Sequence, residues 1–544
     1  MKNFKYKFIA SAFAALTMVS CNDLDTAPMG STVTTDQKTE AVASNPDRIK
    51  ASIAAIPAGF YDFGKLTGEG NHNDLFYAAT MIFTDTRGMD MVSDNIGYNW
   101  FAAAVDYSDI SATGFATGSI WRTAYKQIMA ANSVVQTVGT YEPADEQLKY
   151  YLAQALTIRA FDYFTLAQLY QHTYVGNENK PCVLLITEEN MDAAASEGCP
   201  RSTVAQVYEF IMNDLNTSIE LLSASSTARE DKRYVDLAVA YGMRARVNLV
   251  MNNWAAAAAD AQNAIDNTAA TPYAISDVDH PGFSDIEDAS WMWGILVAET
   301  DRPVTSGICN FPSHMGSLNY GYASVGAWRR INKALYAQIP ATDVRKGWWL
   351  DENKQSPNID AAQAAYVAAN SIPAYTHMKF GCYNDEIGTS TNANDIPLMR
   401  VEEMYLILAE AQAMAGDPAT GAATLENFVK TYRDPQYTCA AKEGQELTAA
   451  LVQDRVWFQR RVELWGEGFS NNDTRRLNKP LVRFHDSNSN FPEAFRFNMP
   501  ADDGWWLLRF TNSELNTNLA IVDNTGGSMP VQDQHADLRD GVTD

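Results

Sequence analysis

Residues 146–170, EQLKYYLAQALTIRAFDYFTLAQLY, carry apolar side chains at every third or fourth position and follow a candidate N-cap, Asp145. Side chains at this spacing share one face of an α-helix, and that face must be buried against a neighbour. Residues 120–138 have the same spacing, so the two segments are expected to form an antiparallel helix pair. This constrains the chain to an architecture in which helices pack on helices.

Further helical pairs are expected along the chain. A helix should begin at Val204, and residues 235–266 read as two helices joined by a tight turn at Asn252 and Asn253. Residues 401–432 repeat this plan with a turn at GDP. Small residues in both arms allow the helices to approach closely. Hairpins of this length resemble tetratricopeptide repeats, although their period is too irregular for a plain solenoid.

Two zones interrupt the helical blocks, which we place at about residues 120–270 and 400–465. Residues 60–115 and 271–396 are rich in Gly, Pro, Asn, Ser and aromatic residues, with one strand-like stretch at residues 290–299. Binding sites usually lie on loops that a rigid frame holds in place. The two zones are therefore expected to form a loop-rich ligand-binding face.

Signatures of catalysis do not appear. The 7 histidines are scattered, without the spacing of a zinc hydrolase helix, and GYASVG around Ser324 is not a nucleophile elbow. No phosphate loop or dinucleotide fingerprint is found, although sequence alone cannot exclude a glycosidase carboxylate pair. We expect a protein that is not an enzyme and has no cofactor.

One stretch partly matches a calcium loop. DVDHPGFSDIED places Asp277, Asp279, Gly282 and Asp288 at ligand positions, but Pro281 and the aspartate at the last position break the pattern. An ordinary polar loop is the favoured interpretation.

Composition narrows the class of protein. A hydrophobic content of 46% and an aromatic content of 11% indicate a large globular protein, and no apolar run after the N-terminal one is long enough to cross a bilayer. A formal net charge of −25 disfavours nucleic acid and anionic lipid as partners. The cysteines suggest neither a disulfide framework nor a zinc site, although Cys182 and Cys199 could pair across one loop.

The N-terminus carries an export signal. A basic start precedes the apolar run FIASAFAALTMV, which ends at Ser20 and Cys21. This ending resembles a bacterial lipobox, in which the cysteine becomes the lipidated first residue; the alternative is a chance cysteine after a plain secretion signal. We expect a signal peptide at residues 1–20, a flexible lipid-anchored tether at 21–45 and a single domain at 46–544.

A set of motifs in a fixed order resembles the SusD-like (RagB/SusD) outer-membrane lipoproteins. The set includes SC followed by NDLDTAP, IWRTAYKQIMAAN, ALTIRAFDYFTLAQLY, MRVEEMYLILAEA and RRVELWGEGFSNNDTRRL, and it spans nearly the whole chain. Each motif alone is weak, but their order is specific. The sequence departs from the pattern at Asn472, where an aromatic often precedes the aspartate, and this is expected to affect packing rather than function.

The resemblance implies a mostly α-helical fold, with tetratricopeptide-like hairpins supporting a loop-rich ligand face that has minor strands. It further implies a cell-surface lipoprotein of the outer membrane that captures a glycan and delivers it to a SusC-like TonB-dependent transporter. A peptide-binding, RagB-like uptake role is the alternative. A surface glycoside hydrolase is a more distant one.

One candidate binding segment surrounds Trp100. Sugar rings present apolar C–H faces and a rim of hydroxyl groups, so aromatic rings beside polar side chains are typical of their sites. Tyr98 and Trp100 lie close in sequence to Arg87, Asp90 and Asn99, which offers both kinds of group in one region. Packing of Trp100 into the top of the core is an equal alternative.

A second candidate segment is NYGYASVGAW. Tyr320 and Tyr322 flank Gly321, which suits an exposed turn better than a buried strand. Trp293 completes the set of candidates, although it shares its strand face with Trp291, and this parity favours packing.

Overall fold

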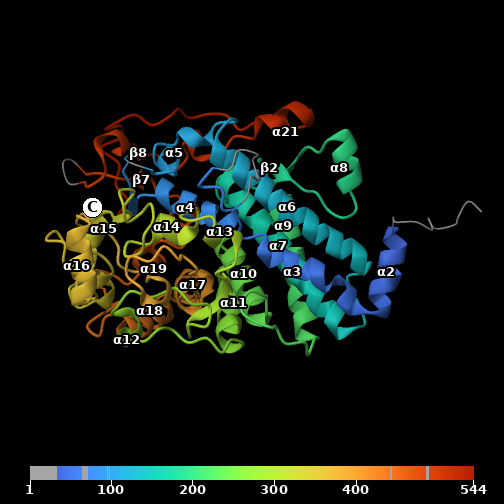
Figure 1. The fold of residues 1–544 in the computed structure, drawn as a ribbon, viewed down its shortest axis with the longest axis horizontal. Coiled ribbons are helices and arrows are strands. Elements are labelled where there is room, and N and C mark those ends of the chain that lie inside the picture. The colour runs from blue at the N-terminus through green and yellow to red at the C-terminus, as the bar shows by residue number, and fades with distance from the viewer. Residues whose placement is uncertain (1–32, 64–70, 95, 97, 442–443, 486–488) are drawn as a thin grey trace, which may run out of the picture.

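The structure is a computed structural model that describes residues 33–63, 71–94, 96, 98–441, 444–485 and 489–544, and most of these residues lie in or between helices (Figure 1). The predicted signal peptide and Cys21 lie outside the described residues. The mostly helical fold class predicted from the sequence is confirmed.

A three-helix layer forms the N-terminal part. Helix α7 (Glu146–Tyr170) packs against both α6 (Phe115–Val138) and α9 (Val204–Ser223), and the three lie side by side in the right half of Figure 1. The predicted cap of α7 is confirmed, because the Asp145 carboxylate accepts hydrogen bonds from the backbone N–H groups of residues 147 and 148 at 2.9 and 3.0 Å. Its long apolar stripe therefore has a neighbour on each side.

Two helical hairpins continue the scaffold. One consists of α10 (Leu237–Val250) and α11 (Trp254–Asp266), and the other of α17 (Val401–Met414) and α18 (Pro418–Tyr432). Helix α11 packs against α17, so hairpins that are far apart in sequence stack on one another. Both predicted hairpins are confirmed.

The other α-helices surround this scaffold, and most of them are shorter. They are α2 (Thr35–Ser44), α3 (Lys50–Ala58), α4 (Tyr77–Arg87), α5 (Ala102–Val105), α8 (Met191–Glu197), α12 (Ile275–Val278), α13 (Arg302–Thr305), α14 (Phe311–Met315), α15 (Lys333–Gln338), α16 (Ala361–Ala369), α19 (Ala449–Glu463), α20 (Ser470–Arg476) and α21 (Asn512–Thr517). Within the described ranges, every helix is too short or too polar to span a bilayer.

The structure corrects the predicted end of the flexible tether, because helix α2 lies within the residues assigned to it. The tether was expected to extend to residue 45, but Thr35–Ser44 forms a helix that packs against α6. Its start carries a capping box, in which the Thr34 hydroxyl accepts from the Gln37 backbone and the Gln37 side chain accepts from the Thr34 backbone. The polar composition that suggested a flexible segment is here the composition of a capped surface helix.

Strands are few and pair antiparallel in twos within the described residues. The pairs are β1 (Met91–Val92) with β5 (Arg330–Ile331), β2 (Pro181–Leu184) with β3 (Arg201–Thr203), β4 (Trp291–Ile295) with β6 (Ile396–Arg400), and β7 (Leu481–Val482) with β8 (Asn498–Met499). The predicted strand-like stretch is thus β4. The pair β1–β5 matters most for the site, because it joins the two loop-rich zones.

The interior contains a network of buried charges. The Glu463 carboxylate contacts the guanidinium groups of Arg433, Arg400 and Arg345 at 2.8, 3.0 and 3.2 Å, and all four side chains are 0% exposed. Burial by itself raises the pKa of Glu463, but the three arginines hold that pKa well below its usual range. The network joins α19, β6 and two loops, so it links parts of the fold that are distant in sequence.

A buried histidine predicts how stability responds to acid. Burial, with a smaller contribution from the nearby cations Lys379 and Arg329, lowers the pKa of His377 to about 3, whereas an unfolded histidine titrates near 6.5. The folded state therefore binds fewer protons between these pH values, and its stability falls as the pH drops below 6.5.

We expect this one side chain to remove about 2 kcal/mol of unfolding free energy between about pH 6.5 and 4.5. In the variant His377→Gln, the decrease over that interval should be smaller by this amount. Chemical denaturation of both proteins at the two pH values measures the difference. Parallel pH profiles would contradict the prediction.

Candidate functional site

Aromatic side chains from both loop-rich zones meet next to the β1–β5 pair. The ring centroids of His72 and Trp100 are 4.6 Å apart, those of His72 and Tyr322 are 5.8 Å apart, and those of Tyr98 and Tyr322 are 6.4 Å apart. The His72 Nδ1 atom also forms a hydrogen bond with the Tyr322 hydroxyl. We call His72, Tyr98, Trp100 and Tyr322 the aromatic cluster.

The aromatic cluster is open to solvent on one side. Tyr98 is 71% exposed, His72 and Trp100 are half-buried, and Tyr322 is buried beneath them. Tyr320, which lies two residues from Tyr322, is 49% exposed. The exposed rings of Tyr98 and Tyr320, with the half-buried His72 and Trp100 beside them, form a platform rather than an enclosed pocket.

A buried arginine fixes the base of the aromatic cluster. Arg329 donates from Nε to the His314 carbonyl at 2.9 Å and from Nη1 to the Asn99 side-chain oxygen at 3.2 Å. His314 in turn stacks on Tyr322, with ring centroids 4.7 Å apart, and donates from Nε2 to the His72 carbonyl at 2.8 Å. The predicted site residue Asn99 is thus buried and holds the loop that carries Tyr98 and Trp100.

Burial lowers the pKa values of the two ionisable side chains in this base, Arg329 and His314. Burial lowers the pKa of Arg329 to about 9, so the guanidinium stays charged at neutral pH. Burial also lowers the pKa of His314 to about 3, which keeps this imidazole neutral. A neutral ring stacked on Tyr322 and a cation hydrogen-bonded to the His314 carbonyl and to Asn99 support the aromatic cluster from below.

Gly321 forms a tight turn that places Tyr320 at the surface and Tyr322 in the interior. A Cβ atom at this position would lie 2.5 Å from the Ser313 Cα atom, which leaves no room for a side chain. The Tyr320 backbone N–H donates to the Thr389 carbonyl at 2.7 Å, and the Tyr322 backbone N–H donates to the Ser313 hydroxyl at 3.0 Å. The turn is therefore pinned on both sides, with Tyr320 exposed and Tyr322 buried.

Three predicted site residues are instead part of the interior, and these predictions are wrong. Arg87 is 0% exposed and donates to a backbone carbonyl at 2.8 Å. Asp90 is 1% exposed and forms an ion pair with Arg461 at 2.7 Å. Trp293 is 0% exposed and donates from its indole N–H to the Arg233 carbonyl at 3.0 Å. All three side chains are enclosed by the protein, so none of them reaches the surface.

The residues of the candidate calcium loop have separate partners. Asp277 accepts from the backbone at the start of α12, Asp279 pairs with His280 at 3.0 Å, and Asp288 accepts from the Tyr273 hydroxyl at 2.5 Å. No group of three or more metal-ligating side chains occurs in the part of the chain that the structure describes. The three aspartates therefore do not converge on a common point in the structure.

The suggested pairing of cysteines does not form. Both Cys182 and Cys199 are free thiols, and the Cys199 thiol donates to the Leu185 carbonyl at 3.8 Å.

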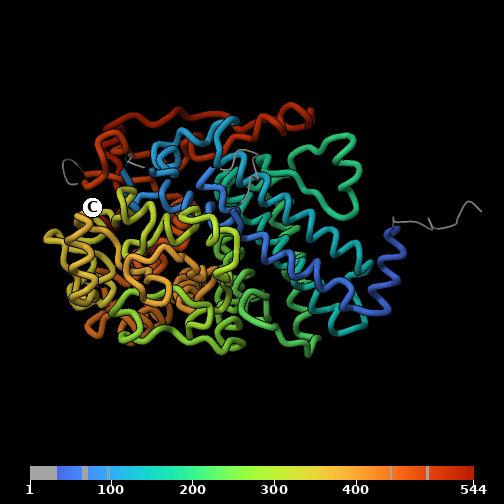
Figure 2. The backbone as a smooth tube through the Cα atoms, viewed as in Figure 1, coloured from blue at the N-terminus to red at the C-terminus, as the bar shows by residue number. Residues whose placement is uncertain are grey.

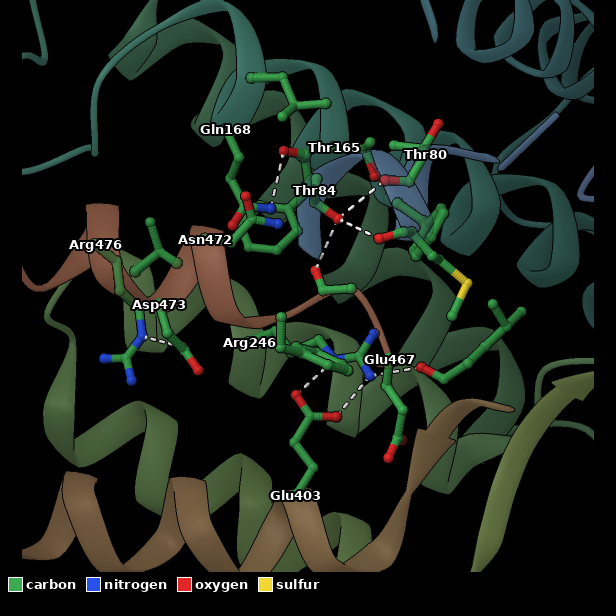
Figure 3. A pocket seen from close by; sticks show the side chains of 18 of the residues that line it. Thr80, Thr84, Thr165, Gln168, Arg246, Glu403, Glu467, Asn472, Asp473 and Arg476 are labelled. Atoms are coloured by element: carbon green, nitrogen blue, oxygen red, sulfur yellow. Dashed lines mark hydrogen bonds and ion pairs between the residues drawn. The ribbon is translucent and has the colours of Figure 1, made fainter. Parts of the chain in front are cut away.

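A polar cavity lies inside the scaffold between α4, α7, α10, α17 and α20 (Figure 3). Its volume is about 60 Å³, and its lining includes Thr84, Asn472 and the Arg246–Glu403 ion pair, whose shortest distance is 2.6 Å. Sites for drug-sized ligands typically measure about 300–1,000 Å³. This cavity has room for a few water molecules only, so the aromatic cluster is the better candidate site.

Sequence comparison places the chain among known proteins. Residues 63–249 match the model of a family described as starch-binding and associating with the outer membrane, and residues 346–526 match the model of the SusD family. A SusD-like protein, P2, from Formosa agariphila is 23% identical over 509 residues, which cover 88% of this chain and 91% of the relative.

Solved structures show the same fold. The crystal structure of a SusD-like carbohydrate-binding protein from Bacteroides vulgatus superposes with a TM-score of 0.69 at 23% identity, covering 87% of this chain and 96% of that one. A SusD superfamily protein from Bacteroides thetaiotaomicron gives a TM-score of 0.68 at 19% identity, covering 88% of this chain and 99% of that one. By its family matches and its fold, this chain belongs to the SusD-like family.

Proposed function

We propose that the chain binds a glycan on the aromatic cluster, at the cell surface, and delivers it to a SusC-like TonB-dependent transporter. The observation that carries this proposal is the exposed Tyr98 beside the half-buried Trp100, both held on a buried, hydrogen-bonded base. Aromatic faces stack on the C–H faces of sugar rings, while the imidazole and phenol groups of the cluster exchange hydrogen bonds with hydroxyls.

The open shape of the aromatic cluster suits a long ligand. An enclosed pocket admits only the end of a polymer, whereas a platform accepts an internal segment whose two ends extend into solvent. Tyr98 and Tyr320 are the most exposed aromatic side chains of the two loops and would contact successive parts of such a chain. The proposed ligand is therefore an oligosaccharide or polysaccharide.

The proposed delivery of the ligand to a transporter follows from the expected location of the protein at the outer membrane. The family is associated with the outer membrane, and we propose that Cys21 anchors the chain there through lipid. A binding protein without a pore needs a transporter to move its ligand across the membrane. The chain acts in this scheme as a binding protein without catalytic activity.

Binding to the aromatic cluster is tested by titration calorimetry against a panel of oligosaccharides. Loss of one stacking ring removes about 1 kcal/mol, so Tyr98→Ala and Trp100→Ala should each weaken binding about fivefold or more. The melting temperature should stay nearly unchanged in Tyr98→Ala, because that ring is 71% exposed, and should fall in Trp100→Ala, because the half-buried Trp100 packs against the core.

The control is Tyr141→Ala, which removes a tyrosine that is 40% exposed and lies outside the cluster, so affinity should be retained. Intact affinity in both cluster variants would refute the proposed site. Binding of peptides but not sugars would favour the RagB-like alternative, and new reducing ends during incubation with the oligosaccharides would indicate a hydrolase.

A further inference from the structure

A groove that shares no residue with the aromatic cluster runs from the end of α20 past the loop that follows α7. It consists of two adjoining hollows of about 540 and 480 Å³, both lined by His172 and Lys180. The first hollow is also lined by Trp254, Arg475 and Asn478, and the C-terminal segment, red in Figure 2, lines part of both. We call the first hollow, with these five residues, the cationic groove. Its volume falls within the range of ligand sites.

The charges in the cationic groove are not balanced by the protein. Arg475 is 7% exposed and has no carboxylate partner within the described residues. Its Nη1 atom donates to the Gln168 carbonyl and its Nη2 atom donates to the Gln171 carbonyl at 2.6 Å, while its Nε atom is buried without any hydrogen-bond partner. Lys180 is exposed and likewise forms no ion pair within that part of the chain, and Asp502 is the one carboxylate among the described residues lining this hollow.

The remaining cation of this hollow is already neutralised. Arg476 pairs with Glu410 at 2.6 Å and with Asp473 at 2.7 Å. Arg475 and Lys180 therefore remain in excess over Asp502, in a chain whose net charge is −25. Burial and the nearby Arg475 and Lys180 lower the pKa of His172 to about 4, which agrees with a positive potential at this place.

A helix end adds to this positive potential. Helix α11 begins at Trp254, on the wall of the groove, and the side chain of its N-cap, Asn253, makes no capping hydrogen bond. That amide donates instead to the Asn248 side-chain oxygen at 3.1 Å. The N-terminus of a helix carries a partial positive charge and presents backbone N–H groups to an anion. Together with Arg475, which is buried without a carboxylate partner among the described residues, it adds to the positive potential of the hollow.

The other residues that line the hollow indicate what kind of molecule would carry the anionic group. Trp254 is half-buried, and Asn177, Asn252, Gln453 and Asn478 line the same hollow. An aromatic face with amide groups around it suits a sugar ring and its hydroxyls, as in the aromatic cluster. We propose that the cationic groove is a second binding site, which takes an acidic saccharide whose rings bear carboxylate or sulfate groups. This site does not depend on glycan binding by the aromatic cluster.

The test uses tetragalacturonate as the probe and the full chain as the protein, in calorimetric titrations at low salt. Lys180→Glu reverses an exposed charge and should weaken binding at least fivefold, since one exposed ion pair contributes up to about 1 kcal/mol and the reversal adds repulsion. Lys333→Glu is the matched control, because Lys333 is exposed, forms no ion pair among the described residues and lies outside the groove. Added salt should weaken binding to the wild type.

Trp254→Ala separates a saccharide site from a plain anion site. This substitution should weaken the binding of tetragalacturonate and leave the binding of inorganic sulfate unchanged. Trp100→Ala should leave the binding of tetragalacturonate at the groove unchanged. Equal affinities in Lys180→Glu and Lys333→Glu, or absence of binding at low salt, would overturn the proposal. Tighter binding of glycerol 3-phosphate than of tetragalacturonate would also overturn it, in favour of a phospholipid headgroup.

Discussion

Replacing Glu463 with glutamine is expected to lower the free energy of unfolding by about 3–5 kcal/mol, because removing one partner of a buried ion pair leaves the other charge uncompensated. Glu463 contacts three arginines that are themselves 0% exposed. Glutamine keeps the shape of the side chain but not its charge, so the three guanidinium groups would face one another with less compensation. Urea denaturation of the two proteins measures the loss.

The control for this variant is Glu189→Gln. Glu189 is an exposed glutamate outside the buried network, and its substitution should change stability by about 0.5 kcal/mol at most. Similar denaturation curves for the two variants would mean that the buried network contributes little to stability.

Replacing Cys21 with alanine is expected to abolish incorporation of labelled palmitate, because its thiol is the proposed attachment point of the lipid. Cys21 lies outside the described residues, so this prediction depends on the sequence alone. The variant should also leave the membrane fraction, while wild-type protein extracted in mild detergent should co-purify with a TonB-dependent barrel in near-equal amount.

Equal labelling of both proteins would contradict the anchor. Repeated recovery of labelled wild-type protein without a barrel would leave the anchor intact and contradict the partner. The two readouts therefore separate the two parts of the proposal.

The scaffold could be predicted because its signals are local. The cap at Asp145 and the apolar spacing of α7 lie within one segment, and the turn between α17 and α18 is marked by GDP. Helix α2 was missed because its short polar sequence has only a weak apolar face, and its contact with α6 cannot be read from the segment itself.

The site could be predicted only in part, because its contacts are distant in sequence. Tyr98, Trp100 and Tyr322 were found from their loop context, but His72 was not, since its partner Tyr322 is 250 residues away. Asp90 appeared to be a surface carboxylate in a polar segment. Its partner Arg461 is 371 residues away, and only the fold shows that the pair is buried.

The division between exposed rings and a buried base in the aromatic cluster has a consequence for how ligand preference can change during evolution. Arg329, Asn99 and His314 fix the loops from below, whereas Tyr98 and Tyr320 contribute little to folding because they are largely exposed. Under the proposed function, substitutions at these two positions would alter which sugar is favoured without disturbing the fold. The same base would then carry different surfaces, and a lineage that meets a new polysaccharide would need to change only a few side chains to bind it.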